Sequence, residues 1–148
     1  MNLPGQTSQK LQDGWYDTGD IMRRDAAGFF YFVGRADEML ICGGENIYPG
    51  EVEKLLESHP DVAQAAVVPA PDDIKGEIPV AFVVLRAGAR PTESELTDFV
   101  LAHGPAYLHP RIILYKAELP LSGTHKIDRQ ALMGEARAAA VSRGRATP

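Results

Sequence analysis

Cysteine is almost absent from the chain, which has Cys42 alone among its 148 residues. An internal disulfide is therefore excluded, and a single free thiol is typical of a reducing compartment, so we expect a cytoplasmic protein. No apolar run approaches the roughly 20 residues of a membrane-spanning helix, and we expect no membrane span. The formal net charge is −5. Because nucleic-acid binding needs a basic surface, no nucleic-acid partner is expected.

The patterns that support metal or covalent catalysis are also missing. The four histidines share no metal-ligand spacing with one another or with Cys42, so the sequence predicts no metal site. No serine or cysteine stands in a nucleophile setting such as Gly-x-Ser-x-Gly. No glycine-rich loop has the spacing that cradles a triphosphate. The chain therefore has no part that could hold a triphosphate in such a loop.

The order of apolar segments predicts an α+β fold, with a small central sheet of about three strands flanked by helices. A β-hairpin over Ile21–Val33 precedes this sheet, and its aromatic half, Phe29–Val33, is predicted to be a buried strand. The strands expected after the hairpin are Met39–Cys42, Val62–Val68, Ile78–Leu85 and Ile112–Tyr115.

Three helices are expected around the sheet. The first begins at Pro49, where a missing N–H costs nothing, and ends before Pro60. Thr92 caps the second helix, and Glu95 completes a capping box. The third helix covers 128–140.

The hairpin has no helix of its own, whereas the later strands alternate with helices. We therefore predict a domain boundary at Arg35–Asp37. Residues 1–36 are assigned to one unit and residues 37–140 to a second. Residues 141–148 are expected to form a loose tail.

Two acids and an arginine lie close to this boundary. The Asp20 carboxylate is suited to accept both hydroxyls of a ribose, although by itself its pattern favours a turn residue that binds its own backbone. Arg35 offers a planar fork for phosphate or ribose oxygens, although by itself a surface ion pair is favoured. Asp37 stands where a hinge residue would absorb a change in backbone torsion.

Two later features have a similar double interpretation. Gly43 and Gly44 would allow another molecule to approach the backbone, but their spacing favours a turn that ends a strand. Lys126 lies in the small-residue loop Leu121–Lys126. Its ammonium could neutralise charge on a phosphorus-centred transition state, while a lone loop lysine is more often a solvated surface group.

Six short motifs follow one another in a fixed order. No single motif identifies a protein family, but the ordered series does. The motifs are Tyr16–Asp20, Gly34–Asp37, Gly43–Ile47, Glu51–Glu53, Leu119–Pro120 and Lys126–Arg129. This series resembles the C-terminal portion of the adenylate-forming (AMP-binding) superfamily, which includes acyl- and aryl-CoA synthetases, peptide-synthetase adenylation domains and firefly luciferase. The resemblance covers nearly all of residues 1–140. The amino-acid sequence of Gly43–Pro49 is most similar to the corresponding segment of acyl- and aryl-CoA ligases.

The resemblance implies that residues 1–36 are the tail of a large AMP-binding domain, with a ribose-binding hairpin, and that 37–140 is the mobile C-terminal domain. Asp20 would bind the ribose hydroxyls of ATP and AMP, Arg35 would contact ribose and phosphate, and Asp37 would be the hinge. Lys126 would bridge the reacting oxygens while a carboxylate attacks the α-phosphate of Mg-ATP, giving an acyl-adenylate and pyrophosphate.

After a rotation of the small domain, CoA would be the second substrate. The resemblance implies that Gly43 and Gly44 line a passage for its pantetheine thiol. Tyr107 and Arg111 would stack on the CoA nucleotide and pair with its phosphate, and His109 stands where a base is often found.

The chain departs from the family pattern in two ways. His125 replaces the glycine that usually precedes the lysine. The phosphate loop and acyl pocket belong to a large N-terminal domain that is absent here, and that domain would hold most of the Mg-ATP. We therefore expect part of an ATP-dependent acyl-CoA synthetase, inactive alone, whose partners are its own N-terminal domain, a small carboxylate and CoA. The alternatives are a domain of a ligase that loads a carrier protein and a stand-alone docking module without catalysis.

Overall fold

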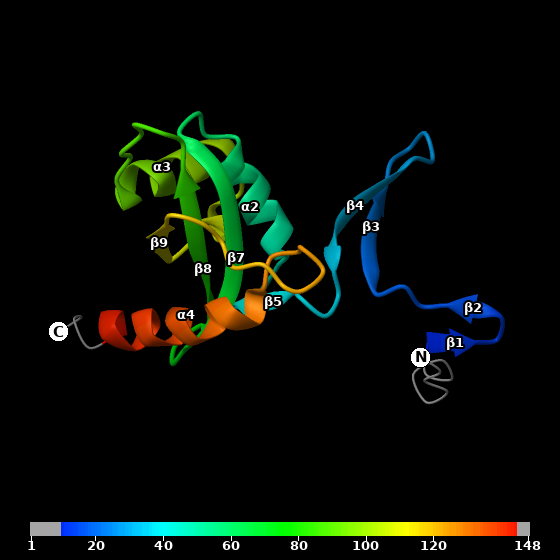
Figure 1. The fold of residues 1–148 in the computed structure, drawn as a ribbon. Coiled ribbons are helices and arrows are strands. Elements are labelled where there is room, and N and C mark those ends of the chain that lie inside the picture. The colour runs from blue at the N-terminus through cyan, green and yellow to red at the C-terminus, as the bar shows by residue number, and fades with distance from the viewer. Residues whose placement is uncertain (1–9, 145–148) are drawn as a thin grey trace.

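The computed structural model describes residues 10–144 and contains a mixed five-stranded sheet (Figure 1). Its strands are β5 (Leu40–Cys42), β6 (Glu45–Ile47), β7 (Val62–Asp72), β8 (Gly76–Leu85) and β9 (Ile112–Lys116). β8 is the central strand: it pairs with β7 in antiparallel fashion along nearly its whole length and with β9 in parallel. β5 joins β8 through one residue pair, Cys42 with Gly76, and β6 lies outside β5.

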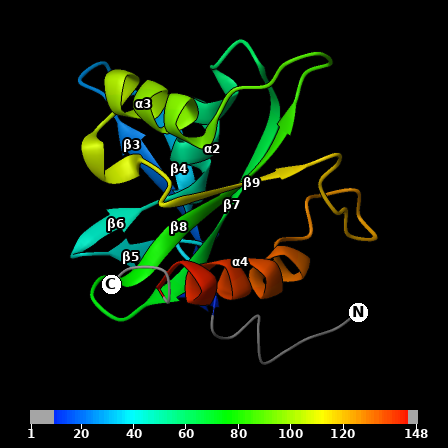
Figure 2. The ribbon, with the colours of Figure 1, turned by 90° about the vertical axis from the view of Figure 1, so that its left-hand side faces the viewer.

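Three helices flank this sheet within residues 10–144: α2 (Pro49–Glu57), α3 (Glu93–His103) and α4 (Arg129–Gly144). α2 and α3 lie side by side, and the strands pass between this pair and α4 (Figure 2). Consecutive residues are buried in β7, over 65–68, and in β8, over 78–83. Such runs are typical of strands that are covered on both faces. The predicted α+β class is confirmed, and we call residues 40–144 the sheet unit.

The helix starts follow the sequence signals. Pro49 occupies the first turn of α2. Thr92 caps α3, because its Oγ1 accepts a hydrogen bond from the Glu95 N–H at 3.2 Å while Glu95 Oε2 accepts one from the Thr92 N–H at 2.7 Å. This reciprocal pair is the predicted capping box, and it satisfies two N–H groups that the helix leaves unpaired.

Two features of the sheet unit were not predicted. The sheet has five strands where about three were expected: the predicted strand Met39–Cys42 joins it as β5, and β6 was not predicted because its three residues after the Gly43–Gly44 turn are too few to show a pattern. The loose tail predicted from residue 141 is wrong for residues 141–144, which continue α4 to Gly144. Alanines at 138–140 favour the helix, and Arg143 near its C-terminus suits the helix dipole and donates to the Arg111 carbonyl at 2.7 Å. Residues 145–148 lie outside the described residues.

Two small antiparallel pairs precede the sheet unit. They are β1 (Leu11–Gln12) with β2 (Trp15–Tyr16), and β3 (Asp20–Arg24) with β4 (Phe30–Arg35). The β3–β4 hairpin stands to one side of the sheet unit (Figure 1). Its end meets the sheet unit at Gly34, where a Cβ would come within 3.0 Å of the Tyr48 side chain. A glycine is therefore required for this close approach.

The prediction that Phe29–Val33 is a buried strand is wrong. The segment is a strand from Phe30 onward, but Phe30 is 64% exposed and Phe32 is 60% exposed. α2 contacts one part of β4, but the Phe29, Phe30 and Phe32 side chains remain more than half exposed within residues 10–144. Arg23 lies over the Tyr31 ring and Arg24 over the Phe30 ring, each 5.7 Å from the ring centroid, which shields two of the rings in part.

Candidate functional site

Asp20 and Arg35 lie opposite each other in the register of the β3–β4 hairpin. Arg35 Nη1 is 3.0 Å from Asp20 Oδ1 and donates a second hydrogen bond to the Thr18 carbonyl at 2.8 Å. Both side chains are about one-third exposed. The predicted ribose acid and phosphate arginine are thus neighbours.

The turn before Asp20 is held by its own side chains. Asp17 Oδ1 accepts from the Gly19 N–H at 2.8 Å, and Thr18 Oγ1 accepts from the Asp20 N–H at 3.1 Å. Gly19 has φ of +73°, and a Cβ there would lie 3.1 Å from Arg35 Nη2. The glycine is needed both for the left-handed backbone and for the guanidinium that lies against it.

Arg35 also binds Asp37, at the predicted hinge. Its Nε lies 3.1 Å from Asp37 Oδ1 and its Nη2 lies 3.3 Å from Oδ2, so one guanidinium is shared by both predicted acids. The hydrogen bonds that Arg35 donates to Asp37 and then to Asp20 raise the pKa of Arg35. The hydrogen bond from Arg35 lowers the pKa of Asp37 against a smaller opposing effect of burial. The Asp37 carboxylate is therefore ionised and tethered to the hairpin.

Lys126 is exposed in a tight loop that connects to α4. The Ser122 N–H donates to the Lys126 carbonyl at 2.7 Å, the His125 N–H donates to the Ser122 carbonyl at 2.9 Å, and Leu121 bridges Ile127. His125 has φ of +60°, the left-handed conformation that ends such a loop and normally favours glycine. The histidine therefore adopts a left-handed backbone, at some strain.

The Lys126 loop faces a depression of about 610 Å³ that also contacts the hinge region. Its lining residues are Glu38, Ser122, His125, Lys126, Ile127, Asp128, Arg129 and Gln130. Glu38 directly follows Asp37 in the chain. The structure thus brings the predicted catalytic lysine next to the predicted hinge, although these residues are far apart in sequence.

Gly43 and Gly44 form the two-residue connection between β5 and β6, with φ of +60° and +90°. Two positive φ values are the requirement of a type I′ hairpin turn, so the turn interpretation explains both glycines. A Cβ on either would meet nothing within 4 Å, so this turn is also open to an approaching molecule. The Gly43 N–H donates to the Lys75 carbonyl at 2.9 Å, which places the β7–β8 loop beside it.

Arg111 lies at the same end of the sheet, just before β9. The His109 Nδ1–H donates to the Ala106 carbonyl, which leaves Nε2 to accept from Arg111 Nη1 at 2.5 Å. Arg111 Nε is buried without a hydrogen-bond partner. Together with Lys75 and Arg143 it lines a depression of about 280 Å³. Tyr107, on the short 3-10 helix Ala106–Leu108, is 38% exposed.

Glu53 and Arg129 each belong to one of the six motifs, but the sequence predicted no site role for them. Arg129 Nη1 is 2.5 Å from Glu53 Oε1 and donates to the Val67 carbonyl at 2.9 Å, and its Nη2 is 3.1 Å from Glu53 Oε2. The pair joins two motifs that are separated by 76 positions. The signal available in the sequence was that Glu53 and Arg129, in two motifs of the same series, carry opposite charges and could therefore pair.

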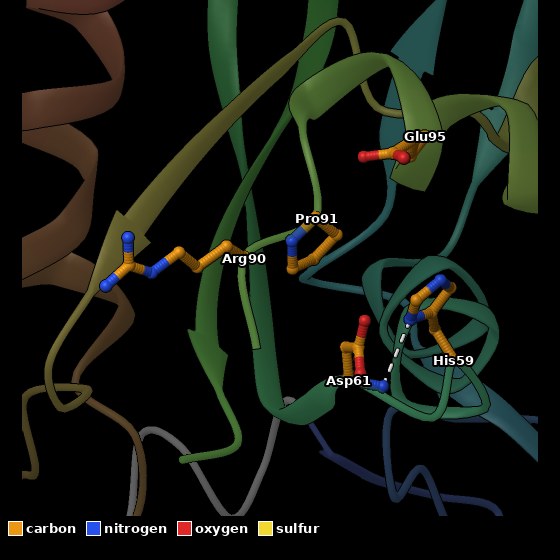
Figure 3. A pocket seen from close by; sticks show the side chains of 5 residues that line it. All are labelled: His59, Asp61, Arg90, Pro91 and Glu95. Carbon is orange, nitrogen blue, oxygen red and sulfur yellow. Dashed lines mark hydrogen bonds between the residues drawn. The ribbon is translucent and has the colours of Figure 1, made fainter. Parts of the chain in front are cut away.

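A third depression, of about 380 Å³, is lined by His59, Asp61, Arg90, Pro91 and Glu95 (Figure 3). Its polar groups have structural tasks: Glu95 caps α3, and His59 Nδ1 accepts from the Asp61 N–H at 3.1 Å. None of the predicted site residues lines it. Within residues 10–144 no three His, Cys, Asp or Glu side chains form a group that could hold a metal ion, and no helix there is long and apolar enough to cross a membrane.

Comparison with known proteins gives one consistent answer. The chain is 41% identical over 129 residues to 2-succinylbenzoate–CoA ligase of Geobacillus kaustophilus, covering 87% of this chain and 26% of that protein. It is 40% identical over 138 residues to the medium/long-chain-fatty-acid–CoA ligase FadD8 of Mycobacterium tuberculosis, covering 88% and 24%. The chain thus spans about a quarter of the length of these relatives.

Solved structures agree. The structure of o-succinylbenzoate CoA synthetase (MenE) from Bacillus subtilis, in complex with its acyl-adenylate intermediate OSB-AMP, superposes with a TM-score of 0.83 at 37% identity, covering 88% of this chain and 27% of that one. An amide bond synthetase from Marinactinospora thermotolerans, McbA, has the same TM-score at 33% identity, covering 89% and 27%. The family model of the AMP-binding enzyme C-terminal domain matches residues 51–126. The chain belongs to the family of AMP-binding enzyme C-terminal domains, and its relatives are acyl- and aryl-CoA ligases.

Proposed function

We propose that this chain is the hinge and C-terminal domain of a ligase that activates a carboxylate with ATP and transfers the acyl group to CoA. The observation that carries the proposal is the arrangement of charges: an acid–arginine–acid cluster on the hairpin and hinge, and a lysine loop on the sheet unit beside that hinge. The lysine and the cluster lie on different units, so a torsion change at Asp37 would change their separation.

In the first half-reaction the carboxylate oxygen attacks the α-phosphate of ATP, an acyl–phosphate bond forms, and pyrophosphate leaves. Asp20 would hold the ribose hydroxyls, because ionised carboxylate oxygens accept hydrogen bonds from both. Arg35 would contact ribose and phosphate. The Lys126 ammonium would stabilise the charge that develops on the reacting oxygens. Magnesium accompanies ATP, and we infer that the large domain holds most of this complex.

In the second half-reaction the CoA thiol attacks the acyl carbon and AMP leaves. The open Gly43–Gly44 turn would line the thiol's passage. Arg111, with an unpaired buried Nε, and the exposed Tyr107 ring would receive the CoA nucleotide at the same end of the sheet. Lys75, Arg111 and Arg143 line this depression together with one acid, Asp72, so its net positive charge suits a phosphate group.

We also propose that the chain is inactive without a large N-terminal domain. The chain spans only about a quarter of its relatives' length. The exposed aromatic residues of the β3–β4 hairpin fit a surface that packs against the rest of such an enzyme, because contiguous exposed aromatic residues usually mark an interface. A cytoplasmic location suits this ATP- and CoA-dependent reaction.

The test is a graft. The 2-succinylbenzoate–CoA ligase of Geobacillus kaustophilus would receive this chain in place of its own matching segment, and acyl-adenylate and CoA-thioester formation would be measured separately with 2-succinylbenzoate. We expect both products from the graft and neither from this chain alone. Lys126→Ala in the graft should slow adenylate formation by about 10²–10³, the size of a lost charge-stabilising donor. It should leave thioester formation from supplied adenylate nearly unchanged.

Arg111→Gln is the matched variant for the other half-reaction. It should raise the KM for CoA and leave adenylate formation unchanged. Turnover of ATP and a carboxylate by the chain alone would contradict the proposed dependence on a large domain. A folded graft that forms adenylate but transfers the acyl group to a carrier protein or an amine, and not to CoA, would contradict the proposed acceptor.

A further inference from the structure

Arg129, three residues after Lys126, connects the start of α4 to three other parts of the molecule. Its guanidinium binds Glu53 on α2 through two nitrogens, at 2.5 and 3.1 Å, and donates to the Val67 carbonyl on β7 at 2.9 Å. Its Nε lies 3.6 Å from Glu38 Oε2, beside the predicted hinge. A two-pronged contact of this kind fixes direction as well as distance.

These contacts lie at one edge of the sheet, along β7. β7 pairs only with β8 among the described strands, so one of its edges is open. Glu53 Oε1 accepts from the Val67 N–H at 2.7 Å, and Glu57 Oε1 accepts from the Ala65 N–H at 3.0 Å. α2 therefore covers this edge with carboxylates, as edge strands generally require. Arg129 completes the cover by binding the Val67 carbonyl and the Glu53 carboxylate together.

The Glu53–Arg129 pair is partly withdrawn from water, with Glu53 14% and Arg129 27% exposed. Burial acts against the charged guanidinium, but the hydrogen bonds and charge of Glu53 prevail and raise the pKa of Arg129. The Arg129 guanidinium therefore stays charged. The loop that it borders is different: no residue from 121 to 126 is buried, and the loop's shape rests on its own backbone bonds.

We propose that Arg129 is a positioning residue for Lys126: it holds the Lys126 loop against α2 and the edge of β7, so that the loop moves with the sheet unit as one body. The inference rests on the proposed role of Lys126. Backbone bonds set the shape of the loop, and the Arg129 contacts set its place. A domain that swings about Asp37 can deliver a lysine to a reacting phosphate only if the loop does not swing separately.

Spin labels test this placement in the 148-residue chain without any substrate. One label is attached to the cysteine of Gly123→Cys at the tip of the loop, where a Cβ meets nothing within 4 Å. The other is attached to the cysteine of Lys54→Cys, at an exposed position on α2. The native cysteine is removed by Cys42→Ala. Pulsed electron resonance then gives the distribution of distances between loop and helix. We expect one narrow distribution, at least twofold broader in Arg129→Gln.

Glu135→Gln is the matched control, because it removes another α4 ion pair, Lys116 Nζ with Glu135 at 2.7 Å. It should leave the distribution narrow. Arg129→Lys keeps the positive charge but lacks the paired donors of the guanidinium, so its distance distribution should have an intermediate width. If Arg129→Gln does not fold by circular dichroism, Arg129→Lys and Glu53→Gln provide the same comparison.

An unchanged distribution in folded Arg129 variants, or equal broadening in Glu135→Gln, would overturn the proposal. The measurement needs neither ATP nor a large domain. A failed graft therefore leaves it standing, and a failed placement leaves the ligase proposal standing.

Discussion

The β3–β4 hairpin and the sheet unit use their apolar residues in opposite ways. Every buried hydrophobic side chain among residues 10–144 lies between Leu40 and Ala136, whereas the hairpin leaves Phe29, Phe30 and Phe32 largely exposed. The sheet unit therefore has its own core, and the hairpin is held mainly by strand pairing and surface ion pairs. The predicted nucleotide residues Asp20 and Arg35 belong to the part without a core. Their geometry rests on the strand register and on their own ion pair.

The largest expected difference between the two regions is in core packing. Phe82 is fully buried in β8, and Phe82→Ala should lower the free energy of unfolding by about 3–5 kcal/mol. Phe32→Ala in the exposed hairpin should change it by less than about 0.5 kcal/mol. Urea denaturation followed by circular dichroism measures both. Similar losses in the two variants would show that the hairpin shares the core's cooperative unit.

Two threonine hydroxyls give a smaller, matched comparison. Thr92 caps α3, and Thr18 accepts from the Asp20 N–H in the turn before β3. Thr92→Ala should cost about 1 kcal/mol of unfolding free energy, the usual value of a lost helix cap. Thr18→Ala should leave global unfolding unchanged, because the hairpin contributes little to it. Equal effects on the unfolding midpoint would contradict the separation of the two regions.

The sequence predicted the sheet unit better than the hairpin, for a physical reason. Pro49, Thr92 and Glu95 mark helix starts by local chemistry that needs no partner, and the structure has both helices where these signals predict them. The burial of Phe29–Val33 was predicted from hydrophobicity alone, which cannot tell which molecule or domain covers a strand. The salt bridge between Glu53 and Arg129 was missed because it depends on how α2 and α4 meet across β7.

The next comparison concerns two residues with a left-handed backbone conformation: Gly19, in the turn before β3, and His125, in the Lys126 loop. His125→Gly should relieve about 1–2 kcal/mol of backbone strain. It should also lose roughly 0.5–1 kcal/mol through the freer unfolded chain, so a net gain of about 0.5 kcal/mol is expected. Gly19→Ala should instead disturb the Arg35 guanidinium and leave global stability unchanged. Thermal unfolding and the Arg35 Nε–H resonance measure the two effects.

The smallest effect is the acid response of the hairpin and hinge carboxylates. The hydrogen bond from Arg35 lowers the pKa of Asp37, and the hydrogen bond from Tyr31 lowers the pKa of Asp25. A carboxyl whose folded pKa is below its unfolded value stabilises the structure above the unfolded pKa, near 3.8. That contribution is lost as the pH falls through the folded pKa. Carboxyl carbon resonances followed from pH 6 to pH 2 should therefore give midpoints below 3.8 for both residues. Arg35→Gln should return Asp37 to its ordinary value and leave Asp25 unchanged. A midpoint for Asp37 that does not move in Arg35→Gln would mean that the guanidinium does not hold the Asp37 carboxylate in solution, and the link between the predicted hinge and the predicted nucleotide residues would fail with it.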